Sequence, residues 1–302
     1  MRHLRLLHYI VETARSGSIR QAAEKLNITA SALNRRIQDL EDELGAQLFE
    51  RMARGVRLTA VGEMFVRHAQ AQLAEADQVR SQIEDLKGLR RGPVRIACSQ
   101  AVATDFLPSQ IALFEKGRPR LTFETRVMDH DRAAEALMAY EVELAVIFRL
   151  SDWPAIATIA RLPQRLVVVM REDHPLAKAE TVRLSDCLSY PLALPDRSLG
   201  GRQVLESVLA RRELRVSPHA ESNSFEMLRG LVLRCNMLSI QIEIGAPPED
   251  LNTGLIGRPI DDRDVPRADL TLCQLRGRSL PVAASAFAEQ LAKEMAVRAE
   301  RL

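Results

Sequence analysis

The sequence contains few aromatic side chains and no recognisable signature of an enzyme active site. Phe, Trp and Tyr make up 4% of the 302 residues, which disfavours binding of single-stranded nucleic acid or RNA loops on an aromatic stacking platform. A Gly-rich phosphate loop, an HExxH motif and a paired CxxC are all missing, since Gly200-Gly201 is an isolated pair and the six histidines are scattered. We therefore expect a protein that is not an enzyme and that carries neither a cofactor nor a metal.

Cysteine is scarce, and its spacing is uninformative for metal binding. Cys98, Cys187, Cys235 and Cys273 lack the paired spacing of a metal site, and three of them lie in apolar segments. We expect buried reduced thiols, with a redox switch as the alternative interpretation.

Long hydrophobic runs are absent as well. No stretch is apolar enough to span a bilayer, and Arg5, His8 and Glu12 interrupt the apolar core that a signal peptide would need. The hydrophobic content of 46% over 302 residues is still ample for about two or three compact units. We expect a cytoplasmic protein with no membrane partner.

What the sequence does contain, near its amino end, is a pair of short helical patterns that meet at a polar turn. The first pattern ends at Leu26, the turn is Asn27-Ile28, and Thr29 is placed to cap the second helix. The small pair Ala22-Ala23 lets the helices approach. An apolar stripe on the second helix faces a core and consists of Leu33, Ile37, Leu40 and Leu44. The pattern predicts a helix-turn-helix motif that reads DNA.

The other faces of this second helix carry small and hydrogen-bonding side chains that suit the major groove. We expect DNA contacts from Ser31, Asn34, Arg35, Arg36 and Gln38. An ordinary solvated amphipathic helix pair is the alternative interpretation of the same pattern.

A basic hairpin is expected after this helix. Gly45 ends the helix, Leu48-Phe49 returns to the core, and residues 51–58 turn near Arg54-Gly55. Arg51 and Arg54 are placed to meet phosphates or a minor groove, although arginines at a hairpin tip are also commonly solvated surface. Residues 1–58 hold ten basic and seven acidic residues, a balance of +3, whereas the remainder holds 32 against 33. The basic excess therefore lies with the motif.

A long amphipathic helix is expected next. Residues 59–88 contain no proline, and apolar residues recur with a mean step of about 3.5, the coiled-coil period; they are Phe65, Ala69, Leu73, Ala76, Val79, Ile83 and Leu86. Such a helix would be roughly 45 Å long at 1.5 Å per residue. It is expected to pair with a second copy, the alternative being a single helix packed on its own domain, and residues 89–93 should break it as a hinge.

Beyond Pro93 the pattern changes to alternating strands and helices. A first βαβαβ set is expected at residues 94–98, 106–116, 121–127, 129–140 and 143–148, in a mainly parallel sheet whose ligand sites lie at the carboxyl ends of strands. A second set is expected at residues 166–170, 199–212, near Val216, 224–234 and 238–240. This order indicates two lobes with a cleft between them.

Over nearly its whole length the chain resembles the LysR-type transcriptional regulators. The most specific match is in the head, at Gly17-Ser18-Ile19, Gln21-Ala22-Ala23, Leu26-Asn27-Ile28-Thr29, Leu44-Gly45 and Leu48-Phe49-Glu50-Arg51. The resemblance implies an α/β chain in three parts. These are a winged helix-turn-helix domain at 1–58, a linker and dimerisation helix at 59–89, and a periplasmic-binding-protein-like effector domain at 90–302, with lobe I at 93–162 and 268–302 and lobe II at 163–267.

The same resemblance implies a site for a small-molecule effector in the cleft. Ser99, Gln100 and Ala101 follow the first strand, and Asn223 and Ser224 match the family's second polar cluster. Phe148, at the end of a strand, is a further expected contact, although Ser224 or Asn223 can be a plain helix cap and Phe148 plain core. The family's polar residue is missing at Ala101, which weakens the inference of a strongly anionic ligand.

The partners implied are double-stranded promoter DNA, the effector, further copies of the chain and RNA polymerase. A homodimer through the linker helix and a homotetramer are both compatible with the resemblance. Two other functions stay open, a ligand-independent architectural DNA-binding protein and an enzyme with an appended DNA-binding head. The sequence does not identify the effector, the target genes or the sign of regulation.

Overall fold

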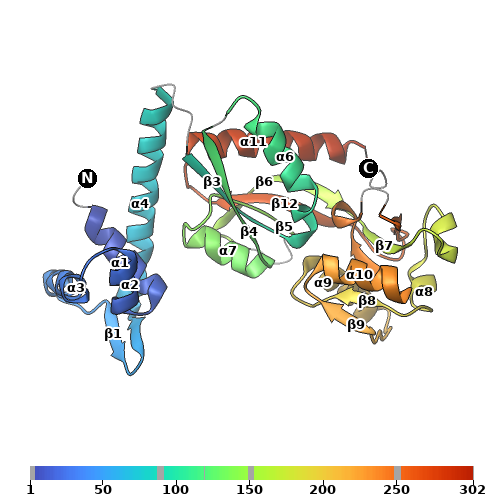
Figure 1. Cartoon of the computed structure of the whole chain (residues 1–302), viewed down its shortest axis with the longest axis horizontal. Coiled ribbons are helices and arrows are strands. Elements are labelled where there is room, and N and C mark those ends of the chain that lie inside the picture. Colours follow the sequence, from blue (N-terminus) through green and yellow to red (C-terminus); the bar gives the residue numbers. More distant parts are fainter. Residues whose placement is uncertain (1–3, 87–91, 119, 149–152, 248–252, 302) are drawn as a thin grey trace. The chain divides into compact units, whose positions relative to one another are not determined.

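The computed structural model describes residues 4–86, 92–118, 120–148, 153–247 and 253–301. The chain divides into two compact units, Met1–Lys87 and Gly88–Leu302, which are shown in Figure 1 and treated separately below.

The first unit consists of helices and one short hairpin. Its elements are α1 (Leu4–Ser16), α2 (Ile19–Lys25), α3 (Ala30–Leu44), β1 (Phe49–Met52), β2 (Gly55–Leu58) and α4 (Ala60–Leu86).

Local hydrogen bonds start and stop the two helices of the motif. The Ser18 hydroxyl caps α2 by accepting from the backbone N–H of Gln21, and Thr29 caps α3 by accepting from Ala32 N–H. Between them Asn27 turns the chain in the left-handed region at φ 54°. Gly45 ends α3 in the same region at φ 64°. The predicted turn and both boundaries of the second helix are confirmed.

The core of this unit lies between α1, α2, α3 and the base of the hairpin. Ala22 and Ala23 are buried where α2 meets α3, as predicted. The apolar stripe of α3 is buried at Leu33, Ile37 and Leu40, but Leu44 is 44% exposed. The prediction that Leu44 faces the core is wrong because the chain turns away at Gly45, directly after it.

The hairpin is held against the turn between α1 and α2. Phe49–Met52 pairs with Gly55–Leu58 in antiparallel register. The backbone N–H of Val56 donates to the carbonyl oxygen of Gly17 over 2.9 Å. A Cβ at Gly55, whose φ is +105°, would lie 2.2 Å from that oxygen, so only glycine permits this approach. The hairpin predicted from the basic segment is present, and the start of its second strand is fixed to the turn between α1 and α2.

Helix α4 is a single unbroken helix of 27 residues. Its start is fixed by Thr59, whose hydroxyl accepts from Gly62 N–H and donates to the Gln47 carbonyl oxygen. Along its apolar stripe, Ala69 is buried, whereas Val79 and Ile83 are each 46% exposed. Residues 89–91 of the predicted hinge lie outside the described residues, and Gly92 and Pro93 begin the next strand.

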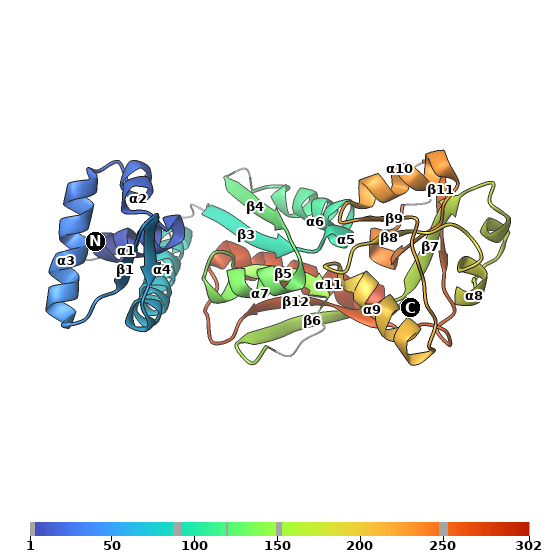
Figure 2. The same cartoon turned by 90° about the horizontal axis from the view of Figure 1, so that it is seen from below.

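The second unit contains two lobes, which Figure 2 shows from below. Lobe I is built from β3 (Gly92–Cys98), α5 (Gln100–Ala103), α6 (Phe106–Glu115), β4 (Leu121–Val127), α7 (His130–Met138), β5 (Leu144–Phe148), β6 (Ile156–Gln164), β12 (Ala268–Leu275) and α11 (Val282–Ala299). Lobe II is built from β7 (Leu166–Arg171), η1 (Pro175–Lys178), α8 (Leu184–Cys187), β8 (Ala193–Pro195), α9 (Gly200–Arg211), β9 (Ala220–Ser222), α10 (Phe225–Cys235), β10 (Ser239–Ile242), η2 (Glu243–Gly245) and β11 (Leu255–Pro259).

Lobe I has a five-stranded sheet in the order β4-β3-β5-β12-β6. Alternate residues of its strands face opposite layers, so that Ala97 and Ala145 pack under α7 while Ile96 and Val146 share a core with α6 and α11. The pairs β3–β4 and β3–β5 are parallel, but β12 is antiparallel to both β5 and β6. The parallel arrangement expected for the strands of the first set, β3, β4 and β5, is confirmed, and the strand that returns from lobe II, β12, runs in the opposite direction.

Lobe II has a three-stranded antiparallel sheet, β10-β7-β11, and a parallel pair, β8-β9. Val167 and Val169 of β7 pack against Val232 of α10. The strand predicted near Val216 is wrong. Residues 214–218 have no regular structure, since Pro218 has no N–H to donate to a strand partner, and the strand lies at Ala220–Ser222 instead.

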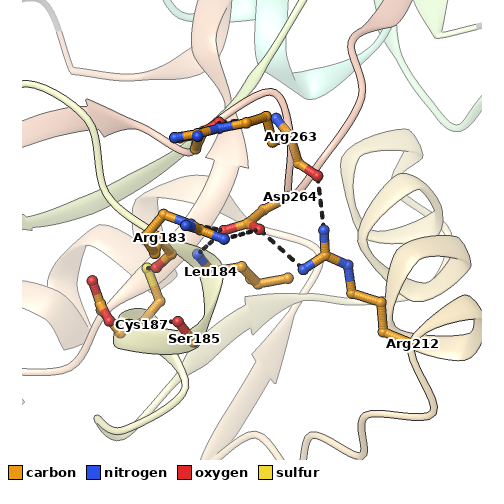
Figure 3. A network of polar contacts seen from close by, with 9 residues as sticks. Arg183, Leu184, Ser185, Cys187, Arg212, Arg263 and Asp264 are labelled. Carbon is orange, nitrogen blue, oxygen red and sulfur yellow. Dashed lines mark hydrogen bonds and ion pairs between the residues drawn. The ribbon is translucent and has the colours of Figure 1, made fainter.

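The chain crosses between the lobes twice, and polar contacts fix both crossings. Arg165 alone separates β6 from β7 and pairs with Glu243 over 3.0 Å. On the return, the buried carboxylate of Asp264 accepts from Arg183 (2.7 and 2.8 Å), Arg212 (3.0 Å) and the backbone N–H of Leu184 (3.0 Å). Figure 3 shows Arg183 and Arg212 reaching this carboxylate from two sides. These donors hold the pKa of Asp264 well below its usual range, the Arg183 hydrogen bonds being the largest cause.

We predict that Asp264→Asn destabilises the second unit by about 2 kcal/mol, because it weakens charge-assisted hydrogen bonds to a buried acceptor. Urea unfolding followed by the fluorescence of Trp153, the single tryptophan of the chain, measures this. The pKa of Asp264 is lower in the folded than in the unfolded protein. The difference in stability between the native protein and Asp264→Asn is therefore fully present above about pH 4, the pKa of an unfolded Asp. It is lost as the pH falls toward the folded pKa.

The matched control is Asp262→Asn, which removes a half-exposed carboxylate paired with Arg267. Such a surface pair contributes at most about 1 kcal/mol. Equal effects of the two substitutions would contradict the assigned role of Asp264.

Candidate DNA interface and effector site

One face of α3 presents the predicted base-reading side chains. Ser31, Arg35 and Gln38 are exposed, and Asn34 is half-buried beside them. Their spacing of three and four residues places them on the face opposite Leu33, Ile37 and Leu40. Arg36 is also exposed, but adjacent helical residues do not share a face, so it lies on the flank of the helix.

The hairpin meets this face through Arg51. A guanidinium nitrogen of Arg51 donates to the Asn34 side-chain oxygen over 3.2 Å, which joins the strand β1 to the reading helix. Arg54 lies in the turn of the hairpin and is exposed, whereas Arg57 pairs with Glu50 over 2.9 Å. The structure therefore gathers Ser31, Asn34, Arg35, Gln38 and Arg51 at one surface.

In the second unit the predicted effector residues lie where the two lobes meet. Ser99 follows β3, and its backbone N–H donates to the Val146 carbonyl oxygen over 2.9 Å. Its hydroxyl oxygen is buried and has no hydrogen-bond partner among the described residues. A buried hydroxyl without a partner is costly, so it is a candidate for ligand contact.

Gln100 and Ala101 make direct contacts across the lobes. The side-chain oxygen of Gln100 accepts from the backbone N–H of Phe225, the first residue of α10, over 3.1 Å. Ala101 packs against Gly245, where an added Cβ would lie 3.0 Å from the Ala101 Cα and 2.8 Å from the Phe225 ring. We call this three-way contact of α5, α10 and η2 the seam.

The remaining predicted residues have structural roles that the structure makes explicit. Phe148 is 3% exposed, and a Cβ at Gly200 of α9 would lie 2.6 Å from its Cβ, so it packs between the lobes. The Ser224 hydroxyl caps α10 by accepting from Met227 N–H, while Asn223 is exposed. Of the two interpretations of Ser224, effector contact and plain helix cap, this hydrogen bond corresponds to the helix cap.

All four cysteines are free thiols, and none forms a disulfide. Cys98, Cys187 and Cys273 are buried, whereas Cys235 is exposed. Burial raises the pKa of Cys98 to about 11 and that of Cys187 to about 12, so both are poor nucleophiles at neutral pH.

Three residues of the lobe interface were missed from the sequence. Gly200 and Gly245 each permit a close approach between lobes, and Arg229 of α10 donates to the Gly245 carbonyl oxygen. A glycine in an α/β pattern is a weak local signal of close packing. For Arg229 no local signal exists, since its partner is distant in sequence.

A winged helix-turn-helix joined in one chain to a two-lobed α/β domain defines a class of DNA-binding transcriptional regulators. Family models agree: the LysR substrate binding domain matches residues 87–296, and the bacterial regulatory helix-turn-helix protein of the lysR family matches residues 4–63. The chain therefore belongs to the LysR family of transcriptional regulators, with a DNA-binding domain and an effector-binding domain.

Individual relatives have low sequence identity to this chain, but the similarity extends over most of its length. A probable nitrogen assimilation transcriptional activator of Synechocystis sp. is 28% identical over 259 residues, which cover 85% of this chain and 82% of the relative. The fold is shared with a full-length OxyR variant of Pseudomonas aeruginosa, at a TM-score of 0.74 and 22% identity over 96% and 97% of the two chains. The effector binding domain of QuiR in complex with shikimate has a TM-score of 0.58 and 20% identity over 68% and 98%.

Across the parts of the chain that are described, no helix is long and apolar enough to cross a membrane.

Proposed function

We propose that this regulator reads two half-sites of promoter DNA through α3 and the wing, and that a small molecule bound between the lobes changes how the oligomer lies on that DNA. The exposed polar face of α3, joined to the wing by the Arg51–Asn34 hydrogen bond, carries the DNA part of the proposal. In this proposal the regulator acts in the cytoplasm, where promoter DNA is present. It has no enzymatic activity.

In this proposal, residues of α3 and the wing divide the work of binding. Arg35, Ser31, Asn34 and Gln38 face the base edges, since they share the surface opposite the core. Arg51, Arg54 and Arg36 contact the phosphate backbone, which positions the helix without reading sequence.

Pairing through α4 supplies the second head. The exposed Val79 and Ile83 continue the apolar stripe of this helix, and a second copy would cover them. A two-fold dimer presents two reading helices, as an interrupted inverted repeat requires. Assembly to a tetramer and contact with RNA polymerase are further parts of the proposal.

The effector part rests on the buried Ser99 hydroxyl at the meeting of the lobes. A ligand there would contact Ser99, Gln100 and Ala101 from lobe I and Asn223 and Ser224 from lobe II, with Phe148 at the edge. The shikimate complex of the QuiR domain supports a small-molecule ligand for this fold.

We predict that Arg35→Ala weakens specific binding by about 1–3 kcal/mol, because the bidentate base contact is lost. The DNA upstream of the regulator's own gene is first footprinted to locate the binding site. Fluorescence anisotropy with this site and with a scrambled sequence then measures the loss of specific affinity.

Arg80→Ala is the control, since Arg80 is an exposed arginine of α4 and its replacement removes the same charge away from the reading face. Unaltered affinity of folded Arg35→Ala would remove Arg35 from the interface.

We predict that Ser99→Ala leaves the footprint on this DNA intact and abolishes its change with pooled cellular metabolites. A footprint of the native protein that shifts with metabolites establishes effector control. A footprint that ignores every pool would favour the architectural function instead, and a full response in Ser99→Ala would exclude Ser99 from the site.

A further inference from the structure

A hollow in the surface of lobe II lies outside the site assigned to the effector. Its volume is about 350 Å³, and two segments that are distant in the sequence form its walls. One wall is residues 188–192, between α8 and β8, and the other consists of Arg215, Val216, Ser217 and His219, just before β9. Cavities of about 300–1,000 Å³ accommodate small organic molecules. The hollow, which we call the lobe II pocket, therefore has room for one.

The strands β8 and β9 separate the lobe II pocket from the expected effector contacts. The two strands are parallel, so their amino ends lie at the same edge. Leu192 directly precedes β8 and His219 directly precedes β9, and the His219 N–H donates to the Leu192 carbonyl oxygen over 2.8 Å. Asn223 and Ser224 follow the other end of β9, after three strand residues that span about 10 Å. The pocket and the effector site are thus two separate places.

The lining of the lobe II pocket carries positive charge. It includes the exposed guanidinium of Arg215 and no carboxylate. The same wall offers backbone donors, because residues 214–218 belong to no helix or strand. In the described part of the chain, no backbone carbonyl oxygen accepts from the N–H groups of Arg215, Val216 or Ser217. A guanidinium beside unpaired backbone N–H groups is suited to an oxyanion.

The opposite wall of the lobe II pocket is apolar and is held from behind. Leu188 and Leu192 line it together with the ring of Tyr190. Leu192 is buried, and the Tyr190 ring packs edge-on against the buried ring of His174, with 4.6 Å between the ring centroids. A hydrogen bond from a backbone N–H fixes the His174 ring in turn. The pocket therefore combines a positive wall with a preformed apolar one.

We propose that the lobe II pocket is a second ligand site, which binds a small organic anion with an oxyanion group on an apolar body. Arg215 and the neighbouring backbone N–H groups hold the oxyanion, and the apolar body packs on Leu192 and Tyr190. The proposal goes beyond the function proposed above and does not rest on the cleft, since none of the lining residues is among the expected effector contacts. Both the charge and the apolar body contribute to binding, so a ligand with only one of them binds weakly.

The test is thermal unfolding of the full chain at matched pH and ionic strength, because a ligand that binds the folded protein raises its unfolding temperature. Benzoate and phenyl phosphate carry both features of the expected ligand. Acetate and inorganic phosphate lack the apolar body, and benzamide lacks the charge. We expect benzoate or phenyl phosphate to raise the unfolding temperature at concentrations at which the other three compounds do not. The stronger of the two identifies the oxyanion as a carboxylate or a phosphate.

Variants of the pocket locate this response. Arg215→Gln should weaken the apparent affinity at least about tenfold, since a charge-assisted hydrogen bond is lost. Arg211→Gln is the matched control and should keep the native response, because Arg211 is an exposed arginine of α9 that donates to the Ser207 carbonyl oxygen and does not line the pocket. Ser217→Phe places a ring in the pocket from an exposed position, and it should abolish the response while Arg215 is retained.

Ser99→Ala separates the lobe II pocket from the cleft and should keep the full response to the active anion. A response that is lost in Ser99→Ala but kept in Arg215→Gln would assign the anion to the cleft and overturn the inference. It is also overturned if Arg215→Gln and the native protein respond equally, or if neither benzoate nor phenyl phosphate acts on the native protein. The proposed function is tested separately, by the footprint and its change with metabolites.

Discussion

The contact on which the second unit depends is the close approach of Gly245 to Ala101 and Phe225. A Cβ at Gly245 would lie 3.0 Å from the Ala101 Cα and 2.8 Å from the Phe225 ring, so glycine at this position lets the lobes approach closely. The same approach brings the Phe225 N–H to Gln100 and the Gly245 carbonyl to Arg229. Closure of the lobes and the polar groups at the seam are therefore one arrangement, and a ligand that enters must alter both.

Charged groups of lobe II contribute to both crossings and to the seam. The buried Asp264 receives two arginines and a backbone N–H, so its charge is fully compensated and the return crossing is rigid. The half-buried Arg229 donates to the Gly245 carbonyl oxygen.

Local signals explain which parts of the fold could be predicted. Thr29, Gly45 and the Arg54-Gly55 turn act within a few residues, so the helix-turn-helix and the hairpin followed from the sequence, as did the alternation of strands and helices in both lobes. Strand direction at β12 and the missing strand at Val216 depend on distant partners and on Pro218. In the site, Ser99 and Gln100 could be singled out as polar residues after a strand. The Gln100 bond to Phe225 spans 125 residues, and Arg229 has no pattern around it, so neither could be read locally.

The central claim is that closure at the seam governs how the regulator lies on DNA. The most direct measurement is the footprint of Gly245→Ala on its promoter DNA, compared with the native protein at equal occupancy and without any small molecule. The added methyl crowds Ala101 and the Phe225 ring and so loosens the contact between η2 and α5; the account predicts a footprint of altered length or spacing while the heads still bind both half-sites. An identical footprint from a folded variant of lowered thermal stability, in which the contact is therefore disturbed, would contradict it.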